Sequence, residues 1–168
     1  MKSRTIQKSI YGDQHPMGSI LIRQPLPSAD LHYFDPFILL HHGNNKINPD
    51  NKNEGVGPHP HRGFAPVSFL FKGGVHHRDS RGNNKAVLEG GVQWMNAGMG
   101  IIHSERPVAG TTEMELIQMW INIPAKNKMD TPSYFPISKE DAPQFVSEDN
   151  KISVSIVSGD VLGKMGPV

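Results

Sequence analysis

The chain has 168 residues and a formal net charge of +1, with 36% hydrophobic and 20% charged residues. This length fits one ordinary domain, and the composition excludes a disordered solvating polymer and a membrane protein. The near balance of charges argues against direct binding to nucleic acid or to an anionic membrane. Neither the first residues nor any later stretch has the apolar length of a signal peptide or a membrane span, so we expect a cytoplasmic protein.

The predicted elements are short strands. In the first part of the chain we expect strands at 5–10 and 19–22 joined by a turn-rich stretch at 12–16, a buried strand at 37–40 and a polar loop at 43–58. Five strands separated by glycine-rich turns follow, at 67–71, 75–79, 86–88, 92–95 and 101–105. Residues 113–123 carry apolar side chains on both faces, which predicts a central, covered strand.

Regular structure is expected to become sparse after that strand. A single helical turn is predicted to begin at Ser138, with Asp141 three residues later, and a last strand is predicted at 152–157. The 17 glycines and 14 prolines agree with many turns and few helices. This succession of short strands predicts an all-β sandwich or barrel.

Histidine is the compositional outlier. The chain has nine histidines and no cysteine, which excludes disulfides, thiolate metal sites and cysteine nucleophiles. The imidazole is then the only soft nitrogen ligand available to a transition metal. The spacing of the histidines therefore decides whether the chain has a metal site.

Two pairs of ligand-type residues stand at strand spacing. His59 and His61 flank Pro60, and His103 is followed two residues later by Glu105. Because residues i and i+2 of a strand face the same side, each pair can converge on one point, and the two pairs can meet inside a barrel. Three imidazoles and a carboxylate would hold a divalent metal and leave positions open for substrate or dioxygen. An exposed polar turn is the alternative interpretation of the first pair.

The segments that carry these residues resemble a known family. HPHRGF at 59–64 and GGVQWMNAGMGIIHSE at 90–105 are similar to the signature segments of pirins, a family within the cupin superfamily. DPFILL at 35–40 and SVSIVSGDVLGKMGPV at 153–168 extend the resemblance over nearly the whole chain. It implies an all-β cupin fold, a jelly-roll barrel or double-stranded β-helix. It also implies one metal ion, with these ligands: His59, His61, His103 and Glu105.

The resemblance also implies an activity. Pirins resemble quercetinases, so the leading interpretation is a quercetin 2,3-dioxygenase that opens flavonols with dioxygen, uses iron(II), and takes Glu105 as the base for the 3-hydroxyl proton. The same ligands would accept Mn, Co, Ni or Cu. The expected lining of an apolar pocket over the metal, with ordinary barrel core as the alternative, is Phe64, Phe69, Trp94, Met95, Met99 and Ile102.

Two other functional interpretations remain at this point. In one, the chain is a non-enzymatic iron protein that binds a transcription factor or another protein according to the redox state of the metal. In the other, the short chain is a partial barrel without a function of its own. A partner affinity that differs between Fe(II) and Fe(III) would favour the first, and thermal unfolding unaffected by iron would favour the second.

The sequence departs from the pirin pattern in two respects. Many pirins carry Glu after the HRGF segment, where this chain has Ala65. Pirins also continue past the final segment, so residues 1–150 are expected to form the N-terminal barrel and 151–168 a strand and the start of a second barrel. The chain would then be truncated, naturally short or proteolysed, and we expect self-association through the exposed second-domain interface.

Two histidine pairs lie outside the proposed ligand set. His76 and His77 lie on a predicted strand, where at most one can face inward, and both are expected at the surface. His41 and His42 follow a buried strand, and a role at the pocket rim is the alternative to a plain structural position.

Overall fold

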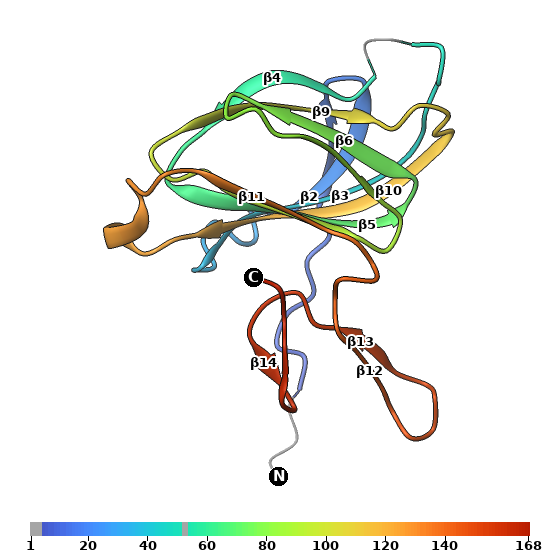
Figure 1. Ribbon diagram of the computed structural model, residues 1–168, viewed down its shortest axis with the longest axis vertical. Coiled ribbons are helices and arrows are strands. Elements are labelled where there is room, and N and C mark those ends of the chain that lie inside the picture. The colour runs from blue at the N-terminus through green and yellow to red at the C-terminus, as the bar shows by residue number, and fades with distance from the viewer. Residues whose placement is uncertain (1–4, 52–53) are drawn as a thin grey trace.

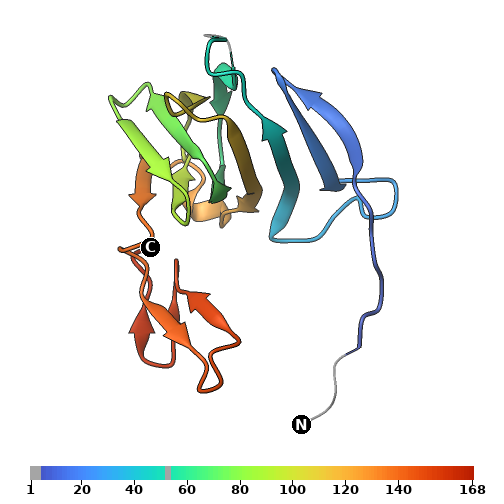
Figure 2. The same ribbon diagram turned by 90° about the vertical axis from the view of Figure 1, so that its right-hand side faces the viewer.

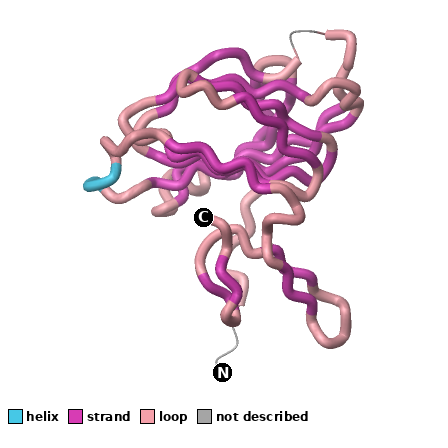
Figure 3. The backbone as a smooth tube through the Cα atoms, viewed as in Figure 1, coloured by secondary structure: helices cyan, strands magenta, loops and turns pink. Residues whose placement is uncertain are grey.

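The computed structural model describes residues 5–51 and 54–168. Within these ranges the strands form two main antiparallel sheets that face each other as two layers (Figure 1). Figure 3 shows that strands and loops make up almost all of the backbone. The all-β class predicted from the short strands is therefore confirmed.

The larger sheet has seven strands in the order β1-β2-β3-β10-β5-β8-β11. Their bounds are β1 (Asp13–Met17), β2 (Ile20–Leu26), β3 (Phe37–Lys46), β10 (Glu113–Asn122), β5 (Phe64–Lys72), β8 (Val92–Asn96) and β11 (Ser133–Ile137). The smaller sheet has four strands in the order β4-β9-β6-β7. Their bounds are β4 (Val56–His61), β9 (Ile101–Pro107), β6 (Gly74–Asp79) and β7 (Asn84–Leu88).

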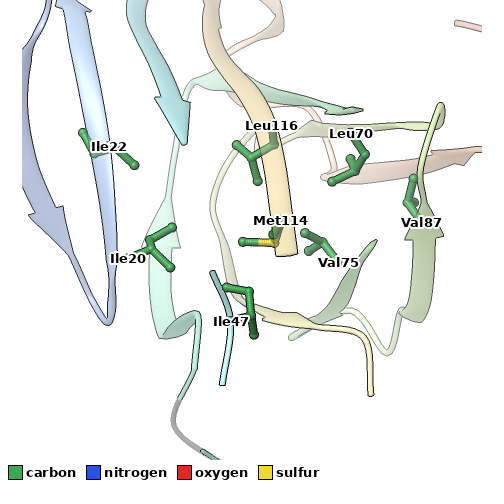
Figure 4. Packing of buried hydrophobic residues seen from close by; sticks show 8 residues of the cluster. All are labelled: Ile20, Ile22, Ile47, Leu70, Val75, Val87, Met114 and Leu116. Carbon is green, nitrogen blue, oxygen red and sulfur yellow. The ribbon is translucent and has the colours of Figure 1, made fainter. Parts of the chain in front are cut away.

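A cluster of buried apolar residues fills the space between the two sheets (Figure 4). Its members come from both sheets and from the segment after β3: Ile20, Ile22, Ile47, Leu70, Val75, Val87, Met114 and Leu116. Burying a side chain of this size contributes about 1.5–3 kcal/mol, so this cluster is a major source of stability. It holds the two layers together, and buried polar residues of both sheets, among them Ser68, His77 and Gln118, lie inside the same barrel.

Strand β10 is the central strand of the larger sheet, as expected for residues 113–123. It pairs with β3 on one side and β5 on the other. Met114 and Leu116 face the smaller sheet, whereas Ile121 joins a second apolar cluster on the outer face. Strand alternation therefore divides this strand into a barrel face at even positions and an outer face at odd positions.

The C-terminal residues form small hairpins outside the two sheets. Strand β12 (Gln144–Val146) pairs with β13 (Ser153–Ser155), and β14 (Asp160–Val161) pairs with β15 (Lys164–Met165). Figure 2 shows these hairpins and the N-terminal segment beyond the larger sheet, on the side away from the smaller sheet. The domain boundary predicted at residue 150 falls in the turn between β12 and β13, where Asn150 adopts a φ of 57°.

The predicted N-terminal strands differ most from the structure. Residues 5–10 form no regular element, and β1 occupies the stretch that was expected to be a connection. The turn lies instead at Gly18, whose φ of 62° is readily adopted by glycine. Pro16 is tolerated in β1 because β1 is an edge strand of the sheet. The buried pair Ile20 and Ile22 then fixes the register of β2.

Two further predictions need correction. The polar loop expected at 43–58 is shorter, because β3 runs to Lys46 and β4 begins at Val56; its residues 52–53 lie outside the described ranges. The turn at Ser138 is held by reciprocal hydrogen bonds with Asp141 but is no helix, while a 3₁₀ helix that was not predicted, η1 (Ala125–Asn127), follows β10. Among the described residues no helix has the length and apolar character needed to span a bilayer.

Candidate metal centre

Three histidines meet on the barrel face of the smaller sheet. His59 and His61 lie on β4, and His103 lies on the neighbouring β9 directly across from His59. The potential ligand nitrogens of the three residues all lie within 4.8 Å of one another. Pro60 between the first two is compatible with this strand because β4 is the edge of its sheet. The i, i+2 pair on β4 and His103 on the neighbouring β9 therefore place three imidazoles around one point.

The hydrogen bonds of these imidazoles leave nitrogen atoms free on the barrel side. The Nδ1 of His59 is 2.8 Å from the carbonyl oxygen of Gly57, which fixes its proton on Nδ1 and leaves Nε2 as an acceptor. The Nε2 of His103 is buried and has no hydrogen-bond partner among the described residues. An unpaired buried nitrogen costs about 1–3 kcal/mol, and a metal ion would satisfy it.

Burial keeps two of the imidazoles neutral. Burial, with a smaller contribution from the neighbouring histidines, lowers the pKa of His61 to about 4 and that of His103 to about 2. A neutral imidazole has the lone pair that a metal requires. These two neutral, buried imidazoles, together with the half-buried His59, therefore form a donor set that fits a divalent first-row transition metal.

Glu105 follows His103 by two residues but is not one of the three residues whose ligand atoms converge within 4.8 Å. Gln93 donates to its Oε1, and the amide of Gln118 donates to its Oε2 at 3.2 Å. Both amides also reach the hydroxyl of Ser68, at 3.3 and 3.0 Å. Burial raises the pKa of Glu105, and the donated hydrogen bonds and nearby histidines oppose this increase. The larger sheet thus holds the carboxylate of a residue from the smaller sheet.

His77 is inside the barrel, contrary to the expectation that both members of the pair lie at the surface. Its side chain is 1% exposed, and its Nδ1 lies 3.3 Å from the Nδ1 of His103. Its Nε2 lies 2.8 Å from Asp79, whose side chain is fully buried. Strand alternation allows one of the two histidines to face inward, and β6 turns His77 inward because it pairs with the ligand-bearing β9.

An aromatic pair lies beside His61. The ring of Phe64 is 5.2 Å from His61, that of Trp120 is 5.1 Å from it, and the two aromatic rings stack at 4.5 Å. The sequence pointed to Phe64 but not to Trp120. Trp120 lies in phase with the barrel-facing Met114 and Leu116, so its inward orientation, though not its contact with His61, was visible in the pattern.

The remaining predicted pocket residues are dispersed. Met95 packs inside the barrel with Ile101 and Tyr134. Met99 is 48% exposed in the turn between β8 and β9, which contacts the turn after β4 through a hydrogen bond from Gly63 N to Gly98 O.

Three of the predicted pocket residues face away from the histidines. Phe69 and Trp94 lie next to the inward-facing Ser68 and Gln93, and so face the other side of the sheet. There they pack, as do the C-terminal residues Val157 and Val168, against a buried cluster of Val67, Val92, Ile137 and Ala142. Ile102 is exposed on the outer face of β9. The prediction of a pocket lining is wrong for these three, because neighbouring residues in a strand point to opposite faces.

His41 and His42 of β3 also face opposite sides of the larger sheet. His41 is buried and its Nε2 lies 2.8 Å from Gln24 Oε1, while its Nδ1 has no partner among the described residues. Burial, with a smaller contribution from His15, lowers the pKa of His41 to about 4. His42 instead contacts Glu115 at 3.2 Å.

Comparison with known proteins agrees with this site and this barrel. The profile of the family described as Pirin matches residues 20–121, which is more than half of the chain. The chain belongs to the pirin family. Pirin-1 of Arabidopsis thaliana is 36% identical over 148 residues, covering 88% of this chain and 48% of that protein.

Solved structures show the same cupin fold. A quercetin 2,3-dioxygenase from Acinetobacter baumannii aligns with a TM-score of 0.85 and 29% identity, over 95% of this chain and 58% of that one. A bacterial pirin from Escherichia coli, solved in complex with nickel(II), aligns with a TM-score of 0.60 and 29% identity, over 74% and 53%. The chain thus spans about half the length of the pirins that it matches.

One departure from the pirin pattern can now be placed. Ala65 pairs with Ile121, and both lie on the outer face of the larger sheet, whereas the preceding Phe64 faces His61. A glutamate at position 65 would therefore point away from the three histidines. The alanine at this position removes no group from the centre.

Proposed function

We propose that this pirin barrel binds one metal ion and forms the reaction centre of a flavonol dioxygenase of the quercetin 2,3-dioxygenase type. The observation that carries the proposal is the buried Nε2 of His103, which has no hydrogen-bond partner among the described residues and faces two further imidazoles. The likeness to a quercetin 2,3-dioxygenase from Acinetobacter baumannii supports the choice of reaction. The chain spans 58% of that protein, so similarity alone does not assign its activity to this chain, and the activity is proposed for the barrel.

His59, His61 and His103 would hold the ion, with Glu105 as the proposed fourth ligand. We propose iron(II), with manganese, cobalt, nickel and copper as further ions that the same donors accept. The bound ion supplies Lewis acidity and a template on which substrate and dioxygen meet.

Glu105 is the proposed base that accepts the 3-hydroxyl proton of the flavonol. Its raised pKa brings the carboxylate closer to the operating pH, which favours proton transfer. A carboxylate has about four acceptor positions, and the amides of Gln93 and Gln118 use two of them. The same amides hold the group in place, so it can take up a proton without losing its orientation.

The stacked rings of Phe64 and Trp120 are proposed to support the aromatic substrate. They lie against His61, which places an aromatic surface next to the metal ligands. A planar flavonol can stack on such a surface, and aromatic pairs contribute about 0.5–1.5 kcal/mol beyond simple burial. Ring opening then consumes one dioxygen and releases carbon monoxide.

Oxygen uptake with quercetin tests the proposal. The protein is loaded anaerobically with Fe(II), and oxygen consumption and carbon monoxide release are measured for the wild type, His59→Ala and the exposed control His32→Ala. We expect uptake in the wild type and the control and its loss in His59→Ala. Uptake that persists in His59→Ala would contradict the proposal, as would bound iron without turnover. In the latter case, partner affinity that differs between Fe(II) and Fe(III) would identify a redox-dependent binding protein.

A further inference from the structure

A buried chain of hydrogen bonds leads from Asp79 through His77 to His103. Asp79 Oδ2 lies 2.8 Å from His77 Nε2, and His77 Nδ1 lies 3.3 Å from His103 Nδ1. Strands β6 and β9 are direct neighbours, and their register sets Asp79 opposite His103. The side chains of His77 and Asp79 are 1% and 0% exposed. Water therefore does not compete for these contacts.

The chemistry of the partners sets the direction of each hydrogen bond. The Asp79 carboxylate accepts only: its Oδ1 accepts from the backbone amides of Arg81 and Asn83, and its Oδ2 accepts from the side-chain amide of Asn83 as well as facing His77. Its partner, His77 Nε2, must therefore carry a proton, and with this single proton on the ring the Nδ1 of His77 is an acceptor. His103 Nδ1 then donates to His77, and the lone pair of His103 is on Nε2. This Nε2 is the atom that is buried without a partner in the three-histidine group.

Tyr134 fixes the plane of the middle ring. It stacks on His77 with ring centroids 3.8 Å apart and an interplanar angle of 6°. Its hydroxyl donates at 3.2 Å to Gln93, whose amide in turn donates to Glu105. Tyr134 thus connects the hydrogen-bond chain behind His103 with the amide that holds Glu105.

We infer that Asp79 and His77 are positioning residues for the metal centre: they set the tautomer of His103 and direct its Nε2 lone pair to the ion. The inference rests on the metal site of the proposed function, although it does not depend on which substrate reacts there. Hydrogen-bond partners behind ligating histidines typically change metal affinity by about 10–100-fold when they are removed. The same loss is expected here.

Asp79→Asn is the most informative variant. The retained oxygen can still accept from the backbone amides of Arg81 and Asn83, although the side-chain amide of Asn83 loses its acceptor at Oδ2. The new amide group would donate to His77 Nε2 and move the proton of His77 to Nδ1. His77 would then donate to His103 Nδ1, which moves the proton of His103 to Nε2. The lone pair needed by the metal would point away from the site.

His77→Phe provides a second, independent variant. A phenyl ring keeps the stack on Tyr134 but gives His103 Nδ1 no acceptor. The matched control is His76→Phe, which makes the same change one residue earlier on the opposite face of β6, away from His103. Asp149→Asn is the control for the aspartate variant, since Asp149 anchors an exposed turn through the amide of Lys151.

Two measurements test the inference. Long-range proton–nitrogen NMR spectra of the metal-free protein report which ring nitrogens of His77 and His103 carry protons, and competition with a chromophoric chelator gives the affinity for Ni(II). We expect protons on His77 Nε2 and His103 Nδ1 in the wild type, the inverted pattern in Asp79→Asn, and affinity lowered about 10–100-fold in Asp79→Asn and His77→Phe but not in the controls.

Several results would overturn the inference. One is a wild-type His103 that carries its proton on Nε2, and another is a His77 protonated on both nitrogens. Variants that lose unfolding free energy but bind Ni(II) as tightly as the wild type would show a structural role alone. These readouts need no flavonol. A protein that binds Ni(II) as expected but does not turn over quercetin would therefore count against the proposed function and not against the positioning role of Asp79 and His77.

Discussion

Gln118→Met should destabilise the metal-free protein by about 2 kcal/mol at pH 7. Gln118 is a buried amide on the barrel face of the central strand β10. It donates to Glu105 and Ser68 and accepts a hydrogen bond from the indole of Trp120 at 3.1 Å. Methionine has a similar length and shape but can make none of these hydrogen bonds.

The magnitude follows from the groups left without a partner. Losing a hydrogen bond to a buried carboxylate costs about 1.5–3 kcal/mol, and leaving the Trp120 donor unpaired costs about 1 kcal/mol more. Ser68 retains its hydrogen bond from Gln93, so it adds little. The apolar methionine side chain returns about 1 kcal/mol through burial. The net loss of about 2 kcal/mol corresponds to a decrease in Tm of about 4–8 °C for a chain of this size.

The pH dependence identifies the carboxylate as the cause. Burial raises the pKa of Glu105 in the folded state, and loss of the Gln118 donor should raise it further. A raised carboxyl pKa means that ionisation opposes folding, so the stability deficit of the variant is largest above the folded pKa. It should shrink as the pH falls towards the ordinary glutamate value of 4.5.

Urea denaturation at pH 7 and about pH 5 measures both effects, with the exposed Gln144→Met as control. The reasoning would be refuted by a deficit below about 1 kcal/mol at pH 7. It would equally be refuted by a deficit that stays constant or grows as the pH falls.

Three further predictions concern other parts of the barrel. Burial lowers the pKa of His41 to about 4, so as the pH falls below 6.5 the unfolded chain takes up the proton first and the folded state loses stability. In urea denaturation, His41→Leu should remove about 1.5 kcal/mol of the stability lost between pH 6.5 and 4, a magnitude that allows for solvent screening. Gly98→Ala should cost about 3 kcal/mol or more, because φ is 45° and the new methyl group would collide with the carbonyl of Asp130, whereas Gly82→Ala at an open position should cost about 1 kcal/mol in the same assay. Ni(II) at 100 times its Kd should add about 2.7 kcal/mol of stability, seen as a rise in Tm of about 5–11 °C, and a similar rise in His61→Ala would contradict the proposed ligands.

Much of the barrel could be predicted from the sequence because its strands are bounded by strong turn signals. Glycines at positive φ separate β5 from β6 at Gly73, β7 from β8 at Gly90 and β8 from β9 at Gly98. The i, i+2 spacing also brought His59 and His61 to one face without any knowledge of the partner strand. Both signals are local, and local patterns survive in the folded chain when tertiary contacts do not oppose them.

The parts that were missed depend on which strands become neighbours. The pattern showed that one of His76 and His77 faces inward, but only the pairing of β6 with β9 shows that it is His77 and that it reaches His103. Gln118 gave a usable signal, because a polar residue lies in phase with the barrel-facing Met114 and Leu116 of a central strand. Such a residue needs buried partners, and the sequence alone did not identify Glu105 as the partner.

In the N-terminal segment the local residue types led to a wrong prediction. Residues 5–10 have the residue types of a strand but form no strand pairing with any described residue, whereas residues 13–17 look like a turn yet pair with β2. The hairpin forms there because Gly18 permits the tight turn, and because Ile20 and Ile22 fix β2 in the core. The burial of β2 outweighed the weak intrinsic strand propensity of residues 13–17.

The most direct test of the metal centre is the metal content of the purified protein, measured by elemental analysis with His103→Ala beside it. The convergence of His59, His61 and His103 predicts about one equivalent of a divalent transition metal in the wild type and its loss in the variant. Absence of metal from both proteins, even after anaerobic loading with Fe(II), would contradict the account, and so would an equal metal content in the two.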